Sequence, residues 1–134
     1  MRIRRRLLAI CATLAATAAT LVAVAQPAAA VSSCQDSGGQ EVCINVFSDG
    51  VWADVASFDD TKFHSPTVAA LQCSGTGSDC VQIAARSDVG HLWLLFWTST
   101  KPYSPGHTYE AIASWIDSAG VHHVAIRTAP ACCP

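Results

Sequence analysis

The sequence predicts an all-β protein, an antiparallel β-sandwich of about seven strands that is stapled by disulfides. Short runs of β-branched and aromatic residues alternate with turn residues, and no stretch after residue 30 keeps a 3.6-residue apolar period. The chain has 134 residues, of which 51% are hydrophobic and 13% charged, which suits one compact domain and argues against disorder. Six cysteines follow residue 30, and an even number in a short exported chain is typical of a disulfide framework.

Residues 1–30 have the layout of an export signal. Four arginines open the segment, a weakly apolar stretch covers residues 7–25, and three alanines end it as a small-residue cleavage site. An uncleaved membrane anchor is the alternative, but threonines dilute the apolar stretch. We expect cleavage after Ala30, or after Ala25, and a secreted, extracellular protein with a single β-sandwich domain over residues 31–134.

The expected mature chain is acidic. Removal of the signal leaves four basic residues against ten acidic ones, a net charge of −6. The basic residues are Lys62, Arg86, Lys101 and Arg127. Nucleic acids and anionic membranes are bound through clustered Lys and Arg, which these four scattered positions do not supply. We therefore expect no nucleic-acid partner, and no membrane partner once the signal is cleaved.

The alternating runs place the seven strands in chain order with turn residues between them, a spacing typical of a sandwich. The expected strands are 42–48, 51–58, 67–73, 80–86, 91–98, 108–116 and 121–128. Asp49-Gly50 predicts a two-residue turn between the first two strands. The expected pairs there are Val46 with Ala53, Ile44 with Val55 and Val42 with Ser57, and the expected outward residues are Asn45, Trp52 and Asp54.

Two further hairpins are expected. The loop 87–90 would join strands 80–86 and 91–98, and the loop 117–120 would join the last two strands. The first of these directs Val81, Ile83, Ala85, Leu92, Leu94 and Phe96 inward, and Arg86, His91, Trp93, Leu95 and Trp97 outward. The second directs Tyr109, Ala111, Ala113, Trp115, Val124 and Ile126 to one face. It also sets Glu110 directly opposite Arg127, an opposite-charge pair that favours the register.

Three disulfides are expected among the six cysteines. Cys73 with Cys80 would close a short loop, worth about 2.5 kcal/mol by chain entropy. Cys34 and Cys43 would then meet Cys132 and Cys133 and tie the two ends of the domain together. A local Cys34–Cys43 bridge with a vicinal Cys132–Cys133 bridge is the alternative. We expect no metal, because the one close pair, Cys132-Cys133, is too tight to chelate a tetrahedral ion.

The segment Tyr103-Ser104-Pro105-Gly106-His107-Thr108-Tyr109 resembles the corner before the sixth strand of fibronectin type III domains. The resemblance extends over residues 103–127, where alternating alanines lead to Asp117 and Gly120. It implies an immunoglobulin-like sandwich in which Tyr109 is the corner tyrosine, with its hydroxyl bonded to the preceding backbone. The whole chain also resembles small cysteine-bearing proteins exported by actinobacteria.

Catalytic residues are not expected, and neither is a cofactor. Asp36-Ser37-Gly38-Gly39 resembles the nucleophile loop of chymotrypsin-like proteases, but those enzymes place their histidine and aspartate upstream of the serine. Every histidine here lies downstream of Ser37, so we expect a flexible turn between Cys34 and Cys43. The histidines are expected to be ordinary surface residues. They are His64, His91, His107, His122 and His123.

Trp93 and Trp97 are the strongest candidates for a binding surface. At positions i and i+4 of one strand they would point the same way, with Arg86 and His91 beside them. Such a face could stack sugar rings or aromatic groups of a protein, or it could be the buried inner face of a second sheet. The continuous apolar run from Leu92 to Trp97 favours the buried interpretation.

We expect a non-catalytic secreted module with an extracellular binding or structural role. Its partner would be an extracellular protein or a cell-surface polysaccharide. One alternative is a carbohydrate-binding module that uses the Trp93 and Trp97 face. Others are a protease inhibitor that presents residues 99–107 with Lys101, and a small secreted hydrolase.

Overall fold

The structure of the chain is a computed structural model that describes residues 30–75 and 79–134. These residues form antiparallel strands and contain no helix, so the all-β prediction is confirmed. The strands are β1 (Val31–Ser37), β2 (Gln40–Phe47), β3 (Gly50–Ser57), β4 (Phe63–Cys73), β5 (Cys80–Ser87), β6 (Leu92–Trp93), β7 (Leu95–Trp97), β8 (Thr108–Ile116) and β9 (His122–Arg127). Six of the seven expected strands are present, with ends that match or are shifted by a few residues. The remaining expected strand, 91–98, is divided into β6 and β7.

The expected export signal falls almost entirely outside the described residues, as does part of the loop between Cys73 and Cys80. Within the described ranges, no helix has the length and apolar character needed to cross a membrane.

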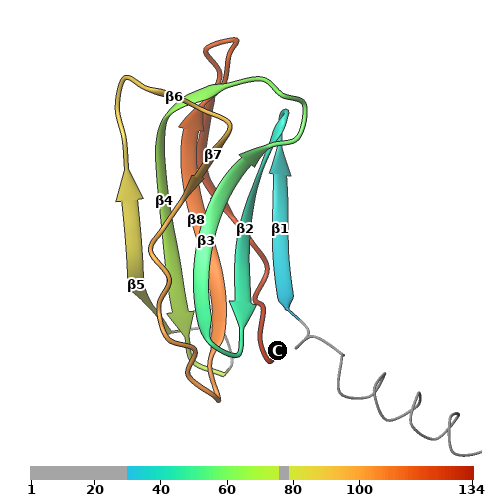
Figure 1. The fold of residues 1–134 in the computed structure, drawn as a ribbon, viewed down its shortest axis with the longest axis vertical. Coiled ribbons are helices and arrows are strands. Elements are labelled where there is room, and N and C mark those ends of the chain that lie inside the picture. The colour runs from blue at the N-terminus through green and yellow to red at the C-terminus, as the bar shows by residue number, and fades with distance from the viewer. Residues whose placement is uncertain (1–29, 76–78) are drawn as a thin grey trace, which may run out of the picture.

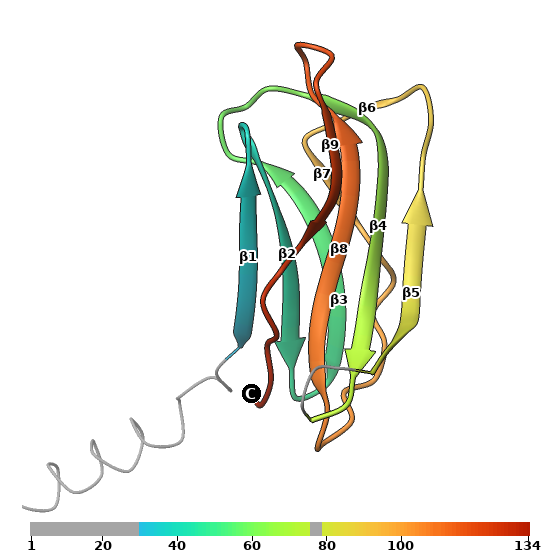
Figure 2. The same ribbon diagram turned by 180° about the vertical axis from the view of Figure 1, so that it is seen from behind.

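Two sheets lie face to face (Figure 1 and, from behind, Figure 2). The first sheet has the order β1-β2-β3-β7, and the second has the order β5-β4-β8-β9, with the short β6 also paired to β4. The edge strands are therefore β1 and β7 in the first sheet and β5 and β9 in the second. The sequence did not predict β1, because its serines, Gln35 and Asp36 give no apolar alternation; the expected flexible turn is instead a strand paired along β2.

The core lies between the sheets and is built by alternation along the strands. The first sheet contributes the fully buried side chains of Val42, Ile44, Val46, Val51, Ala53 and Val55. The second contributes Val68, Ala70, Tyr109, Ala111, Ala113 and Trp115. One polar contact crosses this core: Trp115 Nε1–H donates to Oε1 of the buried Gln40 at 3.1 Å.

The first hairpin has the predicted faces but not the predicted register. Ile44 lies opposite Ala53 and Val42 opposite Val55, so Ser48 and Asp49 form the turn. Gly50 is the first residue of β3, where a Cβ atom would overlap the Thr100 side chain. Gly50 lets the β3 backbone lie close to the Thr100 side chain and takes no part in the turn. The prediction of Asp49-Gly50 as the turn pair is therefore wrong.

The second expected hairpin is wrong. Within the described residues β5 pairs with β4, and the chain after residue 90 divides at Leu94, so that β6 pairs with β4 in one sheet and β7 with β3 in the other. As a result Leu92 and Leu94, expected inward, are 63% and 45% exposed. In β5, Val81 and Ala85 are also exposed, and Ala84 is the buried residue.

The third hairpin exists with a shifted register. Irregular pairing between Ala113 and Trp115 sets His123 opposite Trp115 and Arg127 opposite Ile112. Val124, expected in the core, is therefore 68% exposed. Glu110 and Arg127 are not directly opposite, but they form an ion pair in which Arg127 Nε also donates to Glu110 Oε2 at 2.7 Å.

Three disulfides join all six cysteines of the described residues, and they indicate an oxidising environment. Cys73 pairs with Cys80, as predicted. The predicted link between the two ends is wrong: Cys34 pairs with Cys43, and Cys132 with Cys133. Cys34 and Cys43 are directly opposite each other on β1 and β2, so the unforeseen strand β1 explains the local bridge.

The hydroxyl of Tyr109 contacts the backbone that precedes β8. It accepts a hydrogen bond from the Ser104 N–H at 2.8 Å and lies 3.3 Å from both the Ser104 carbonyl oxygen and Gln72 Oε1. The Tyr109 side chain is fully buried. This contact fixes the segment that enters β8.

Candidate functional site

The outer face of the first sheet, the side turned away from the core, gathers aromatic and polar side chains from its four strands. Strand pairing sets these residues in three rows that run across the sheet. The rows are Ser32, Asn45 and Trp52; then Cys34, Cys43, Asp54 and Trp97; and then Asp36, Glu41, Ala56 and Leu95. We call this set the outer face.

Two tryptophans are neighbours of one carboxylate on the outer face. Trp97 lies directly opposite Asp54, and Trp52 is two residues from Asp54 along β3, which makes the tryptophans diagonal neighbours. The Trp97 side chain is 46% exposed. Trp52 is half-buried because its ring stacks on Phe47, with 4.8 Å between ring centroids. The outer face thus offers aromatic surface on two adjoining sides of Asp54, and Cys43 lies on the side opposite Trp97.

The polar groups Ser32, Asn45 and Asp54 form a hydrogen-bonded series beside the rings. Asn45 Nδ2 donates to Asp54 Oδ2 at 2.6 Å, and Ser32 Oγ donates to Asn45 Oδ1 at 2.8 Å. Burial raises the pKa of the Asp54 carboxyl, and hydrogen bonds from Asn45 and Trp52 oppose that rise. These two hydrogen bonds fix the orientation of the Asn45 amide and of the Asp54 carboxylate.

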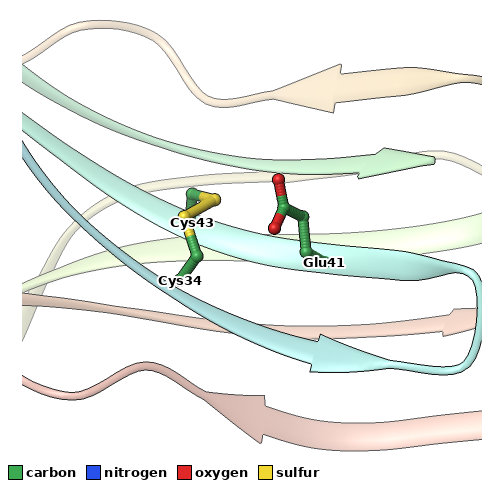
Figure 3. A group of neighbouring side chains, drawn as sticks. All are labelled: Cys34, Glu41 and Cys43. Atoms are coloured by element: carbon green, nitrogen blue, oxygen red, sulfur yellow. A yellow bond between two sulfur atoms is a disulfide. The ribbon is translucent and has the colours of Figure 1, made fainter. Parts of the chain in front are cut away.

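Glu41 lies beside the Cys34–Cys43 disulfide on the same face (Figure 3). Its pKa is raised by burial and then by the negative charge of Asp36, its partner across the strands. A similar group joins Glu110 to Cys73 and Cys80. Both cysteine pairs are disulfides and so offer no thiolate to a metal ion.

Arg86 contacts Trp97 at the side of the sandwich where β5 and β7 are the edge strands. Its guanidinium carbon is 4.4 Å from the ring centroid of Phe96, 5.2 Å from that of Trp93 and 5.4 Å from that of Trp97. Its Nη1 donates to the Trp97 carbonyl oxygen at 3.2 Å. Because Arg86 belongs to β5 and Trp97 to β7, these contacts join edge strands of the two sheets.

The four predicted binding residues are connected, but they do not form the expected platform. Trp93 packs partly buried against the core, with its Nε1–H donating to Asp88 Oδ2 at 2.9 Å. His91 Nδ1 lies 2.9 Å from the same Asp88 oxygen. The hydrogen bond from Trp93 lowers the pKa of the Asp88 carboxyl. Since the strand is interrupted at Leu94, only Trp97 of the four belongs to the outer face.

Three residues of the outer face were not recognised as site residues. Asn45, Trp52 and Asp54 were correctly expected to point outward, but strand 91–98 was paired with 80–86 and not with 51–58. The alternation was therefore visible in the sequence, and the missing information was the neighbour of β3.

A second polar arrangement was also missed. Ser37 Oγ lies 2.6 Å from His123 Nδ1, and His123 Nε2 lies 2.8 Å from Asp117 Oδ2. In the sequence, the position of every histidine after Ser37 argues against a catalytic serine. The chain order of serine, histidine and aspartate nevertheless differs among enzymes of unrelated folds. Only the packing of β1 near β9 brings the three together.

The proposed inhibitor loop is attached to the first sheet at Lys101. The backbone of Lys101 exchanges hydrogen bonds with Val51, at 2.7 and 2.8 Å, in an isolated antiparallel bridge. Residues 99–107 therefore lie partly along β3. The inhibitor interpretation stays a prediction.

Comparison with family models, curated proteins and solved structures finds no match to this chain.

Proposed function

We propose that the chain is a secreted carbohydrate-binding module that holds a cell-surface polysaccharide on the outer face. The observation that carries this proposal is the position of Trp52 and Trp97 next to Asp54, Trp52 along the same strand and Trp97 across from it on β7. Aromatic rings stack on the apolar faces of sugars, and nearby carboxylate and amide groups bind their hydroxyls. The outer face combines both kinds of group on a rigid sheet.

We further propose an immunoglobulin-like topology for the domain. If β2, β3, β4, β5, β7, β8 and β9 are taken as strands A, B, C, C′, E, F and G, the sheets become A-B-E and C′-C-F-G. A buried tyrosine near the start of strand F, bonded to upstream backbone, fits the same scheme. In this proposal β1 is an added edge strand that widens the outer face.

Binding to defined polysaccharides tests the function. Wild-type protein is incubated with insoluble cellulose, chitin, xylan and purified bacterial cell walls, and the unbound fraction is measured. We expect depletion by at least one of these polymers, and a loss of at least about tenfold in affinity for Trp97→Ala and Asp54→Asn. Val124→Ala, which changes a residue of β9 in the other sheet that is 68% exposed, is the matched control.

Two results would contradict the proposal. One is no depletion by any of the four polymers at protein concentrations up to about 1 mM, the weak end of specific binding. The other is binding that is equal in wild type, Trp97→Ala and Asp54→Asn. In either case, a protein partner would be the next hypothesis to test for the edge formed by Leu94, Leu95 and Trp97. Leu94 and Leu95 are 45% and 48% exposed there.

A further inference from the structure

Ser37, His123 and Asp117 form a continuous hydrogen-bonded series at the side of the sandwich opposite Arg86. Ser37 ends β1, His123 lies in β9, and Asp117 directly follows β8. The two contacts are 2.6 Å from Ser37 Oγ to His123 Nδ1 and 2.8 Å from His123 Nε2 to Asp117 Oδ2. The series is independent of the outer face, because it uses none of its residues.

The hydrogen-bond partners fix the direction of each proton. The hydrogen bond from His123 lowers the pKa of Asp117, so this carboxylate is ionised at neutral pH and only accepts. Nε2 of the neutral imidazole must therefore carry the hydrogen, which leaves a lone pair on Nδ1. Ser37 Oγ–H then donates to Nδ1, the arrangement in which a histidine can remove the proton of a serine.

The surroundings hold the imidazole in place without a ligand. The His123 ring stacks on Trp115, with centroids 5.0 Å apart and planes 10° apart, and the residue is only 8% exposed. Gly38, at φ +65°, closes over the ring, since a Cβ there would be 2.9 Å from His123 Cε1. The other oxygen of Asp117 accepts the backbone N–H groups of Ala119 and Val121 at 2.9 and 3.0 Å.

Substrate can approach Ser37 from the end of the sheet. Ser37 is partly exposed, and the exposed Gly38 and then Gly39 follow it in a two-residue turn. A cavity of about 560 Å³ lies next to the series and is lined by Asp117, Lys62, His64 and Leu92, whereas Ser37 and His123 are not among its lining residues. Ser37 itself lies at a strand end beside a turn, a position that suits a small acyl group better than a long peptide.

From this geometry we propose that Ser37 is the nucleophile of an esterase site for short carboxylic esters. Ser37 Oγ adds to the carbonyl carbon while His123 Nδ1 takes its proton. The tetrahedral intermediate collapses, and the departing alkoxide receives that proton from His123. Water then attacks the acyl-serine, His123 takes a proton from the water, and Ser37 Oγ receives it as the acid leaves. The sum is ester plus water to acid plus alcohol, with Asp117 as a positioning residue throughout.

Active-site labelling of the wild-type, disulfide-bonded chain tests the proposal without depending on any variant. The protein is treated with a fluorophosphonate, which phosphonylates activated serines and releases fluoride, and the peptides are mapped by mass spectrometry. We expect an adduct on Ser37 and none on the exposed Ser118, a matched serine near the same end. A folded protein with no adduct on Ser37 would overturn the proposal.

Hydrolysis of p-nitrophenyl acetate provides the second readout. We expect kcat/KM to fall by at least about 100-fold in Ser37→Ala and Asp117→Asn, and to stay unchanged in His122→Ala, the adjacent exposed histidine. The Asp117→Asn amide can donate to His123 Nε2, which places the imidazole hydrogen on Nδ1 and blocks proton removal. A purely structural Asp117 would leave Ser37 reactive in folded Asp117→Asn. Equal hydrolysis by wild type and Ser37→Ala would refute the proposal.

Discussion

Replacement of Gln40 by leucine tests the polar contact that joins the two sheets inside the core. Gln40 is 1% exposed, its Oε1 accepts from Trp115 Nε1–H, and its Nε2 donates to Thr61 Oγ1 at 3.1 Å. Leucine keeps most of the volume but removes the acceptor, so the indole N–H stays buried without a partner. A buried unsatisfied donor costs about 1–3 kcal/mol. For a domain of about 100 residues, a loss of about 2 kcal/mol lowers Tm by about 8–16 °C.

A double-mutant cycle with Trp115→Phe isolates this contact. Phenylalanine has no N–H group, so Gln40→Leu in that background leaves no indole donor without a partner, and its remaining cost is the lost Gln40–Thr61 hydrogen bond, which is the same in both backgrounds. The difference between the two backgrounds gives a coupling free energy of about 1–2 kcal/mol. The assay is urea unfolding of the four oxidised proteins, followed by far-UV circular dichroism so that changes in tryptophan fluorescence do not interfere. An equal cost of Gln40→Leu in both backgrounds would show that the hydrogen bond contributes nothing to stability.

Three further predictions concern stability. Arg127→Met leaves the buried Glu110 carboxylate without its cation and should lower the free energy of unfolding by about 2–3 kcal/mol. This is less than for a fully buried pair, because Arg127 is 46% exposed. Urea unfolding measures the loss, with Lys62→Met as the control. Tyr109→Phe removes the acceptor of the Ser104 N–H and should lower the free energy of unfolding by about 1–2 kcal/mol in the same assay, whereas no change would refute a role in fixing β8. Burial raises the pKa of Asp54 in the folded state, so its charge costs no stability below the ordinary aspartate pKa and costs the full amount above the raised pKa. The free energy of unfolding of Asp54→Asn should therefore increase relative to that of wild type as pH rises from about 3 to about 7. A relative increase on acidification instead would contradict burial as the cause.

The positions of most strands could be predicted because alternation is a local property. Val42, Ile44 and Val46 alternate on β2 with Glu41, Cys43 and Asn45, and small or β-branched residues alternate in the same way on β3 with Trp52 and Asp54. Their faces follow from that alternation even though the register moved by two residues. Strand β1 gave no such signal, since it is held by pairing with β2 and by the Cys34–Cys43 bridge.

Pairing between strands that are distant in the sequence could not be predicted. The run from Leu92 to Trp97 is consistent with either neighbour, and only the interruption at Leu94 sends β7 to β3. The same limit explains the sites. Trp97 was recognised as a binding candidate, but its neighbours Asp54 and Trp52 depend on that pairing, and the approach of Ser37 to His123 depends on β1.

Nuclear Overhauser contacts of Trp97 measure the pairing on which the outer face depends. Thr98 N–H donates to the Ala53 carbonyl, so Asp54 and Trp97 form a pair without mutual backbone hydrogen bonds, and their Hα atoms lie close together. We predict a strong Hα–Hα contact between Asp54 and Trp97, and a second between Ala56 and Leu95. Contacts from Trp97 to Cys80 instead, as in a hairpin across residues 87–90, would contradict the outer face and the function proposed for it.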